Sequence, residues 1–210
     1  MDAPPKKTLR IGLIAGSGVL PALAAQSAAA MGHGIVAVAL SDEVASSLSP
    51  HCDRVYRYGI GEAGRIFKSF KAEGIDRVVI VGRVNKEVIF SRPRFDLRAL
   101  AFLRGARNKN DDHLMAGIAR EFEKEGICLL DQRSFLKELC PGRGILTARP
   151  PTQEEWRDIA YGFALAKKVG ELEIGQTVVV KNQAVLAVEA IEGTDQAICR
   201  GCALGKQGAV

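Results

Sequence analysis

The sequence predicts an α/β protein with a Rossmann-like N-terminal domain, residues 1–139, and a smaller C-terminal α+β domain, residues 153–210. Apolar strand-like runs alternate with helical periods over the first of these ranges, and a segment rich in proline and glycine, residues 140–152, separates it from the second. The chain has 210 residues, of which 47% are apolar and 25% charged, as is typical of a globular protein with a substantial core.

The N-terminal elements follow a βαβ rhythm. A β-branched run such as residues 77–81 is typical of a parallel strand buried on both faces, and Gly74 and Gly126 mark the ends of two helices. The predicted strands are residues 9–15, 35–40, 53–58, 77–81 and 127–130, and the predicted helices are residues 20–31, 62–73 and 111–125. This order predicts a parallel sheet with helices on both faces.

The second domain begins with a helix. Thr152 and Glu155 have the spacing of a capping box for a helix that runs through Lys168, and strands 175–180 and 184–189 follow, joined by a tight turn at residues 181–183. The last residues read as the opening of another strand. We therefore expect this domain to lack a C-terminal segment or to be completed by a partner subunit.

Composition indicates where the protein resides and the redox state of its cysteines. No apolar run approaches the roughly 20 residues of a membrane span, and no signal peptide is recognisable, so we expect a cytoplasmic protein. Five cysteines without a regular framework indicate reduced thiols. Cys199 and Cys202 form a single CxxC, and because no second ligand pair accompanies it, two small residues on one helix face are the simpler interpretation.

The net charge of +5 is concentrated in the basic segment, which we define as residues 83–109. Eight basic residues stand there against Glu87 and Asp96, interleaved with apolar side chains. The basic segment could bind an anionic amphiphile or a membrane surface, bind nucleic acid, or form a solvated face of a core helix. The basic residues are Arg83, Lys86, Arg92, Arg94, Arg98, Arg104, Arg107 and Lys109.

A glycine loop after the first strand is the first candidate site. Gly16 and Gly18 stand between a strand and a helix, where backbone N–H groups can approach a phosphate. Pro21 replaces the third glycine of a dinucleotide fingerprint, and the acidic residue expected some way downstream has only a loose match in Asp42 or Glu43. An anion site, a nicotinamide site and a purely structural turn all remain open.

Two further candidates lie downstream. Gly82 and Arg83 end a buried strand, where open α/β sheets bind ligands and a guanidinium suits a phosphate. Asp111, Asp112 and His113 could ligate Mg²⁺, although adjacent acids at a helix start more often cap it.

The last candidate is an acidic turn. Glu189, Glu192, Thr194 and Asp195 surround Gly193 just before a helix that carries Arg200. Such a turn could hold a metal and a phosphoryl oxygen, or could simply cap the helix.

Five stretches together carry a resemblance to a known family. They are LIAGSGVLP, VIVGRV, DDHLM, the run from ILTARPPTQEEW through GQTVVV, and VLAVEAIEGTDQAI. In this order they resemble the UDP-2,3-diacylglucosamine pyrophosphatase family of lipid A biosynthesis. The resemblance implies a metal-dependent, two-domain hydrolase that releases UMP and 2,3-diacylglucosamine 1-phosphate (lipid X), uses a divalent cation such as Mg²⁺ and forms a homodimer. The basic segment adds peripheral contact with the inner face of the inner membrane as a further expectation.

The resemblance also assigns candidate residues. The catalytic aspartate of the family lies in a continuation with no counterpart before Val210, so the catalytic residue is unassigned and the chain could be an inactive fragment. Two alternatives remain: an NAD(P)-dependent oxidoreductase, and a non-catalytic protein that binds lipid or nucleic acid. For a member of the resembled family we expect no nucleic acid partner. Carried over as substrate-binding are Gly16, Ser17, Gly18, Leu20, Pro21, Gly82, Arg83, Thr194 and Asp195, and as metal ligands Asp195 and Glu189.

Overall fold

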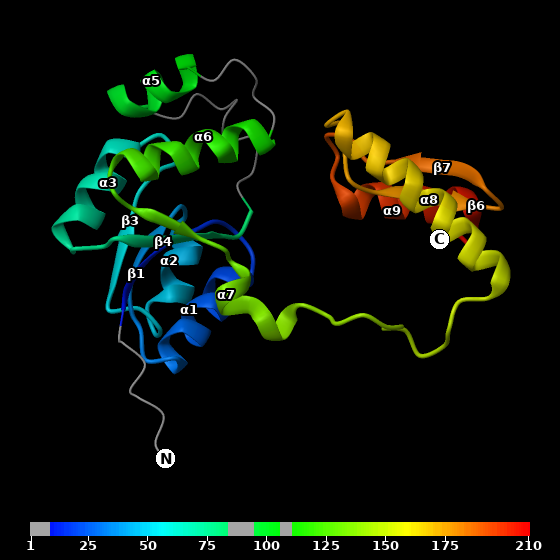
Figure 1. Ribbon diagram of the computed structural model, residues 1–210, viewed down its shortest axis with the longest axis horizontal. Helices are drawn as coiled ribbons and strands as arrows, with labels where there is room; N and C mark the ends of the chain where they lie inside the picture. The colour runs from blue at the N-terminus through cyan, green and yellow to red at the C-terminus, as the bar shows by residue number, and fades with distance from the viewer. Residues whose placement is uncertain (1–8, 84–94, 106–110) are drawn as a thin grey trace. The chain divides into compact units, whose positions relative to one another are not determined.

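The computed structural model describes residues 9–83, 95–105 and 111–210. The chain divides into two compact units, unit 1 from Met1–Pro141 and unit 2 from Gly142–Val210, and each is considered by itself (Figure 1). Residues 142–150, which follow the last helical turn of unit 1, are all exposed and form neither helix nor strand.

Unit 1 is built on a five-stranded, wholly parallel sheet in the order β3-β2-β1-β4-β5. Its strands are β1 (Arg10–Ala15), β2 (Gly34–Ala39), β3 (Arg54–Arg57), β4 (Arg77–Val81) and β5 (Cys128–Leu130). The predicted α/β class and its five strands are confirmed, with ends that differ by one or two residues. The order reverses direction at β1, so β1 and β4 flank the topological switch point, where open α/β sheets bind ligands.

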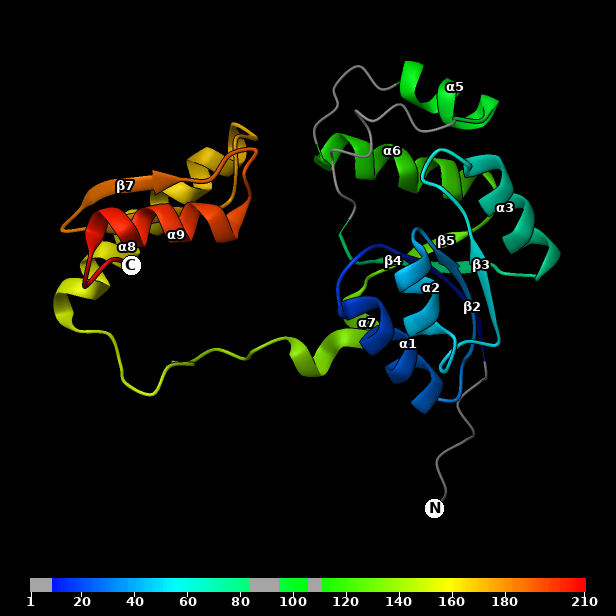
Figure 2. The ribbon, with the colours of Figure 1, turned by 180° about the vertical axis from the view of Figure 1, so that it is seen from behind.

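Each face of the sheet has its own apolar core, because successive side chains of a strand point to opposite faces. Ile11 and Leu13 pack with α1 (Leu20–Ala30), α2 (Asp42–Leu48) and α7 (Arg133–Leu136). Val36, Val38 and Val78 pack against α3 (Ala63–Ala72) and α6 (Asp111–Lys124) on the other side. The helices therefore cover both faces, as Figures 1 and 2 show.

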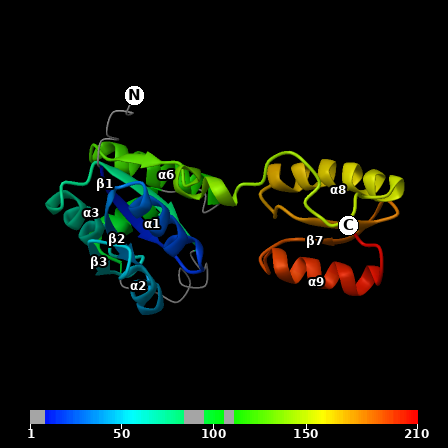
Figure 3. The same ribbon diagram turned by 90° about the horizontal axis from the view of Figure 1, so that it is seen from below.

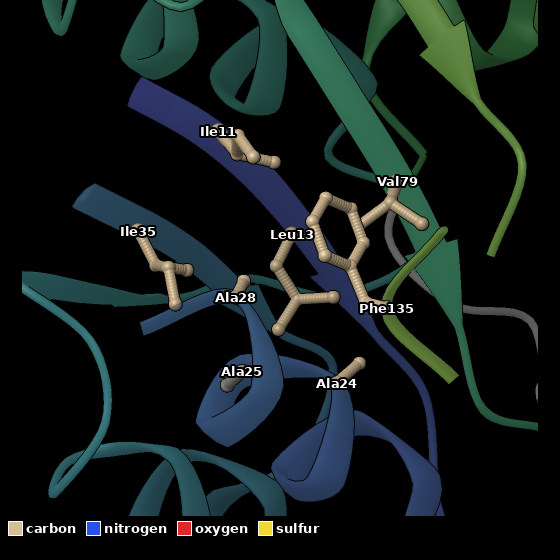
Figure 4. Close-up of a pocket in the computed structure, with 8 residues that line it drawn as sticks. All are labelled: Ile11, Leu13, Ala24, Ala25, Ala28, Ile35, Val79 and Phe135. Atoms are coloured by element: carbon tan, nitrogen blue, oxygen red, sulfur yellow. The ribbon is translucent and has the colours of Figure 1, made fainter. Parts of the chain in front are cut away.

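The packing under α1 is close. Ala24, Ala25 and Ala28 face β1, and the remaining void, bounded also by Phe135, has a volume of only about 10 Å³ (Figure 4). Its lining is entirely apolar. It is therefore a packing gap of the core and offers no polar group to a ligand.

Three of the described helices of unit 1 were given no bounds from the sequence. The helix α2 begins after Ser41, whose side chain accepts a hydrogen bond from the Val44 N–H, so Asp42 and Glu43 form its first turn. Asp42 is ion-paired with Arg57 at 2.9 Å. The others are α5 (Leu97–Gly105), which contacts α3, and α7, which is followed by the 3₁₀ turn η1 (Lys137–Leu139).

Unit 2 is a two-stranded antiparallel hairpin between two helices (Figure 3). Gly162 lies against Val180 on one face of β6, and Gly201 lies against Val179 on the other. Val210 exchanges two backbone hydrogen bonds with Val180, of 2.7 and 2.9 Å. The elements are α8 (Gln153–Glu171), β6 (Val178–Lys181), β7 (Ala184–Val188) and α9 (Thr194–Gly205). The capping box of Thr152 and Glu155 is confirmed, and α8 extends one turn beyond its predicted end.

A buried carboxylate fixes the hairpin turn. Asn182 and Gln183 have φ of 50° and 58°, the left-handed conformation that a two-residue hairpin requires. Their N–H groups donate to the two oxygens of Asp158 on α8, at 2.7 and 2.6 Å. Asp158 is 5% exposed, so this contact ties the helix to the turn inside the unit.

Glu73, at the end of α3, gathers three partners at the amino ends of the strands. Arg10 and Tyr56 bind its carboxylate at 2.9 and 2.7 Å, and Arg54 is also ion-paired with it. The hydrogen bond from Tyr56, followed by those from Arg54 and Arg10, lowers the pKa of Glu73 from 4.5 to about 2. Its contribution to stability is therefore complete above pH 4.5 and is lost as the pH falls towards 2.

We expect Glu73→Gln to be less stable than the parent at neutral pH, with a difference that shrinks steadily between pH 4.5 and 2. Urea unfolding across this pH range measures it. Glu123→Gln, at an exposed position on α6, is the matched control and should show no such trend. A difference for Glu73→Gln that stays constant down to pH 2 would contradict the ion-pair assignment.

Candidate functional site

The structure brings the first two candidates together at the switch point. The loop after β1 and the turn after β4 form an antiparallel bridge between Ser17 and Arg83. The N–H of Ser17 donates to the Arg83 carbonyl at 2.8 Å, the Arg83 N–H donates back at 3.0 Å, and the Ser17 hydroxyl donates to the same carbonyl at 3.1 Å. Two motifs 66 residues apart in sequence thus form one structure.

Glycine is required at both turns for steric reasons. A Cβ on Gly16 would lie 2.4 Å from the carbonyl oxygen of Arg83. Gly82 has φ of +98°, and a Cβ there would lie 2.8 Å from the carbonyl carbon of Gly16 and 2.9 Å from the ring of Pro21. Pro21 therefore packs the helix start against the second turn, which explains a proline where a dinucleotide fingerprint has glycine.

The backbone contacts decide which atoms a ligand could reach. The N–H groups of Gly16 and Ser17 are engaged by the carbonyls of Val81 and Arg83. Gly18 has φ of +99° with open space around it, and it leads into the first turn of α1. A phosphate could therefore approach only from Gly18 onwards, at the exposed end of the loop.

Two exposed apolar side chains and an exposed arginine belong to the residues of this turn. Val19 and Leu20 are 72% and 40% exposed at the start of α1. The Arg83 side chain is exposed, and only its backbone takes part in the bridge. The arrangement offers a charge and an apolar surface next to one helix N-terminus.

A complete G-x-G-x-x-G pattern, missed by sequence reasoning, lies at Gly59, Gly61 and Gly64, from the loop after β3 into the first turn of α3. The place of a phosphate is taken by a side chain of the protein itself. The Asp96 carboxylate accepts hydrogen bonds from the N–H of Gly64 at 2.6 Å and from that of Ala99 at 2.8 Å, and so caps α3 and α5 together. The pattern is therefore used to join two helices and gives no support to a nicotinamide site.

The basic segment lies mostly outside the described residues, but α5 within it is described. Arg98 stacks over Phe67 at 3.8 Å and is ion-paired with Glu125 at 2.7 Å. This arginine holds α5 to its neighbours and is only partly accessible to a partner. The binding roles suggested for the rest of the segment remain predictions.

The acidic turn of unit 2 is internally bonded. Glu189 accepts hydrogen bonds from the Gln176 N–H at 3.2 Å and from the Thr194 hydroxyl at 3.0 Å. Burial raises the pKa of Glu189, but hydrogen bonds from Thr177, the Gln176 N–H and Thr194 outweigh it, so its pKa lies below the usual value. Asp195 is exposed in the first turn of α9, where its negative charge suits the helix N-terminus.

The remaining acid of this turn is also paired. Glu192 accepts hydrogen bonds from Arg200 at 2.6 Å and from the Ala190 N–H at 3.1 Å. Within residues 9–83, 95–105 and 111–210, no group of three or more His, Cys, Asp and Glu side chains is placed to hold a metal ion. The assignment of Glu189 and Asp195 as metal ligands remains a prediction.

The structure also describes the start of α6 and the cysteines of the CxxC. The helix α6 begins at Asp111, as predicted, while the side chains of Asp111, Asp112 and His113 lie outside the described residues. The cysteines, including Cys199 and Cys202, are free thiols. The helices described contain none long and apolar enough to cross a membrane.

Comparison with known proteins agrees with this division into two parts. Residues 10–139 match the LpxI N-terminal domain, and residues 142–210 match the LpxI C-terminal domain. The UDP-2,3-diacylglucosamine pyrophosphatase LpxI of Caulobacter vibrioides is 38% identical over 201 residues, which cover 91% of this chain and 68% of the relative. The chain belongs to the LpxI family.

Proposed function

We propose that the protein hydrolyses the pyrophosphate bond of UDP-2,3-diacylglucosamine. Water attacks one phosphorus, the bridging P–O bond breaks, and the products are UMP and 2,3-diacylglucosamine 1-phosphate. The observation that carries the proposal is the 38% identity to a UDP-2,3-diacylglucosamine pyrophosphatase over nearly the whole chain.

The groups at the switch point of unit 1 match the phosphate and apolar groups of this substrate. Gly18 and the start of α1 would take an anionic oxygen, because helix N-termini present N–H groups and positive partial charge. The guanidinium of Arg83 would pair with a phosphate oxygen, and the exposed Val19 and Leu20 would contact apolar parts of the same molecule. In this role these residues bind and orient the substrate.

In unit 2, considered by itself, the turn at Thr194 and Asp195 is a separate candidate, which the same family resemblance marks as substrate-binding. We further propose that turnover needs a divalent cation, with Mg²⁺ as the first to test, since negative charge develops on phosphate oxygens during hydrolysis. Removing cations with EDTA and then adding back Mg²⁺, Mn²⁺ or Ca²⁺ tests this requirement, and full activity in EDTA would refute it.

Arg83→Gln tests the switch-point assignment. We expect kcat/KM for UMP release to fall about 100-fold, because a charge-assisted bond to phosphate contributes roughly 1.5–3 kcal/mol. Folding should be retained, since the bridge to Ser17 uses only the backbone of Arg83. The matched control is Arg120→Gln, at an exposed position on α6, which should retain full activity.

The assay is UMP release from UDP-2,3-diacylglucosamine in detergent micelles with Mg²⁺. Equal kcat/KM values for Arg83→Gln and Arg120→Gln would remove Arg83 from the site. UMP formation by neither variant nor parent would overturn the proposed activity for this chain.

A further inference from the structure

The outward face of α8 carries a stripe of aromatic and basic side chains. Trp156, Ala160, Phe163 and Lys167 are spaced i, i+4, i+7 and i+11, so they share one face of the helix over about 16 Å. Trp156 and Phe163 are 51% and 64% exposed, and Ala160 and Lys167 are exposed as well. We call these four residues the α8 stripe.

Contacts on the opposite face of α8 show that the α8 stripe points away from the core of unit 2. Asp158 binds the hairpin turn, and Gly162 lies against Val180 of β6. These contacts make that face the interior of unit 2, with the hairpin on one side of α8 only (Figure 3). Two large aromatic side chains are thereby presented away from the core of their own unit.

The exposed charged side chains around the α8 stripe are basic. Lys167 lies 5.3 Å from the ring of Phe163, with Arg157 and Lys168 exposed beside it. Within the described residues none of these three cations forms an ion pair. The exposed acids of the helix, Glu154 and Glu171, stand at its first turn and its last residue.

Four other acids of unit 2 have partners of their own. Glu155 is ion-paired with Arg149, Glu192 with Arg200, and Asp158 and Glu189 accept backbone N–H groups. The middle of the α8 face therefore carries positive charge that these acids do not neutralise. Aromatic rings between cations match the boundary between the head groups and acyl chains of an anionic bilayer.

We propose that the α8 stripe docks the protein onto the surface of an anionic phospholipid bilayer. Trp156 and Phe163 enter the head-group boundary, while Arg157, Lys167 and Lys168 contact lipid phosphates. The choice of a lipid surface as the occupant rests on the proposed function, whose substrate carries two acyl chains. The test needs no turnover, so its failure is distinct from failure of the hydrolysis.

The test uses the fluorescence of Trp156, because the chain contains a single tryptophan. The full chain is mixed with vesicles of phosphatidylglycerol and phosphatidylcholine, or of phosphatidylcholine alone. We expect a blue shift and quenching by brominated acyl chains with the first kind only. Phe163→Ala should weaken partitioning about tenfold, since a buried Phe contributes roughly 1.5–3 kcal/mol.

Charge is tested separately. The double variant Lys167→Gln, Lys168→Gln should lose roughly thirtyfold in partitioning, at about 1 kcal/mol per cation near an anionic surface. Arg143→Gln, in the exposed segment after unit 1, is the matched control and should bind as the parent does.

Three outcomes would overturn the proposal. The first is no vesicle binding. The second is binding without any change in Trp156 emission, which would place the membrane contact elsewhere on the chain. The third is a blue shift that depends on protein concentration without lipid, which would show that a second copy covers the stripe.

Discussion

Gly16→Ala is expected to destabilise unit 1 by about 3 kcal/mol and to disrupt the switch point. The added Cβ would lie 2.4 Å from the Arg83 carbonyl oxygen, with the carbon and nitrogen of the same residue at 2.9 and 3.0 Å. All three are backbone atoms, so no side-chain rotation can relieve the clash. Either β1 or the turn after β4 must move, and the Ser17–Arg83 bridge must open.

The measurement is hydrogen exchange at Ser17 and Arg83 together with thermal unfolding. Both amides should lose protection in Gly16→Ala, and UMP release should fall with them under the proposed function. Gly142→Ala is the matched control, because a Cβ there meets nothing within 4 Å. Protection at Ser17 and Arg83 that matches the control would show that this turn tolerates a side chain.

The sheet was predictable because its signals are local. Four of the five strands are apolar runs, and Gly32, Gly74 and Gly126 each stop a helix just before the next strand. The helix α2 was not predictable, because it spans only seven residues and its start depends on one polar cap at Ser41. The helix α5 was one of several alternatives for the basic segment, because its charges also suggested a ligand, whereas Arg98 binds Phe67 and Glu125.

The individual loops of the candidate site were predictable from the sequence, but the contact between them was not. Gly16 and Gly82 were recognised separately from their positions after apolar strands, whereas the bridge between their loops is a tertiary contact. The pattern at Gly59 to Gly64 follows a short polar edge strand and was overlooked. Its meaning also depends on Asp96, 32 residues beyond Gly64, because only the fold shows that a carboxylate fills the place of a phosphate.

The same limit applies to Asp158, an acidic residue in a helix that sequence alone would place in solvent. Its partners are 24 and 25 residues away, in a turn whose φ angles are positive for two residues other than glycine. The carboxylate offsets part of that conformational cost by binding both N–H groups. A carboxylate so enclosed is therefore part of the folding of unit 2.

Asp158→Asn is expected to destabilise unit 2 by about 3 kcal/mol, nearly as much as Asp158→Ala. The amide has the shape of the carboxylate but only one acceptor oxygen, so its NH₂ group would face an N–H of Asn182 or Gln183. One buried donor loses its partner and two donors oppose each other. Because unit 2 has a small core, we expect the turn and then the hairpin to open.

Hydrogen exchange of the Asn182 and Gln183 amides reports this directly, while amides of β1 in unit 1 serve as the internal reference. The matched control is Asp195→Asn, the same substitution at an exposed acid in the first turn of α9, which should change stability by no more than about 0.5 kcal/mol. If both variants left the turn amides equally protected, the two hydrogen bonds of Asp158 would not be what holds the hairpin to α8. If only Asp158→Asn exposes them, this carboxylate is the contact that makes a helix and a two-stranded sheet fold as one unit.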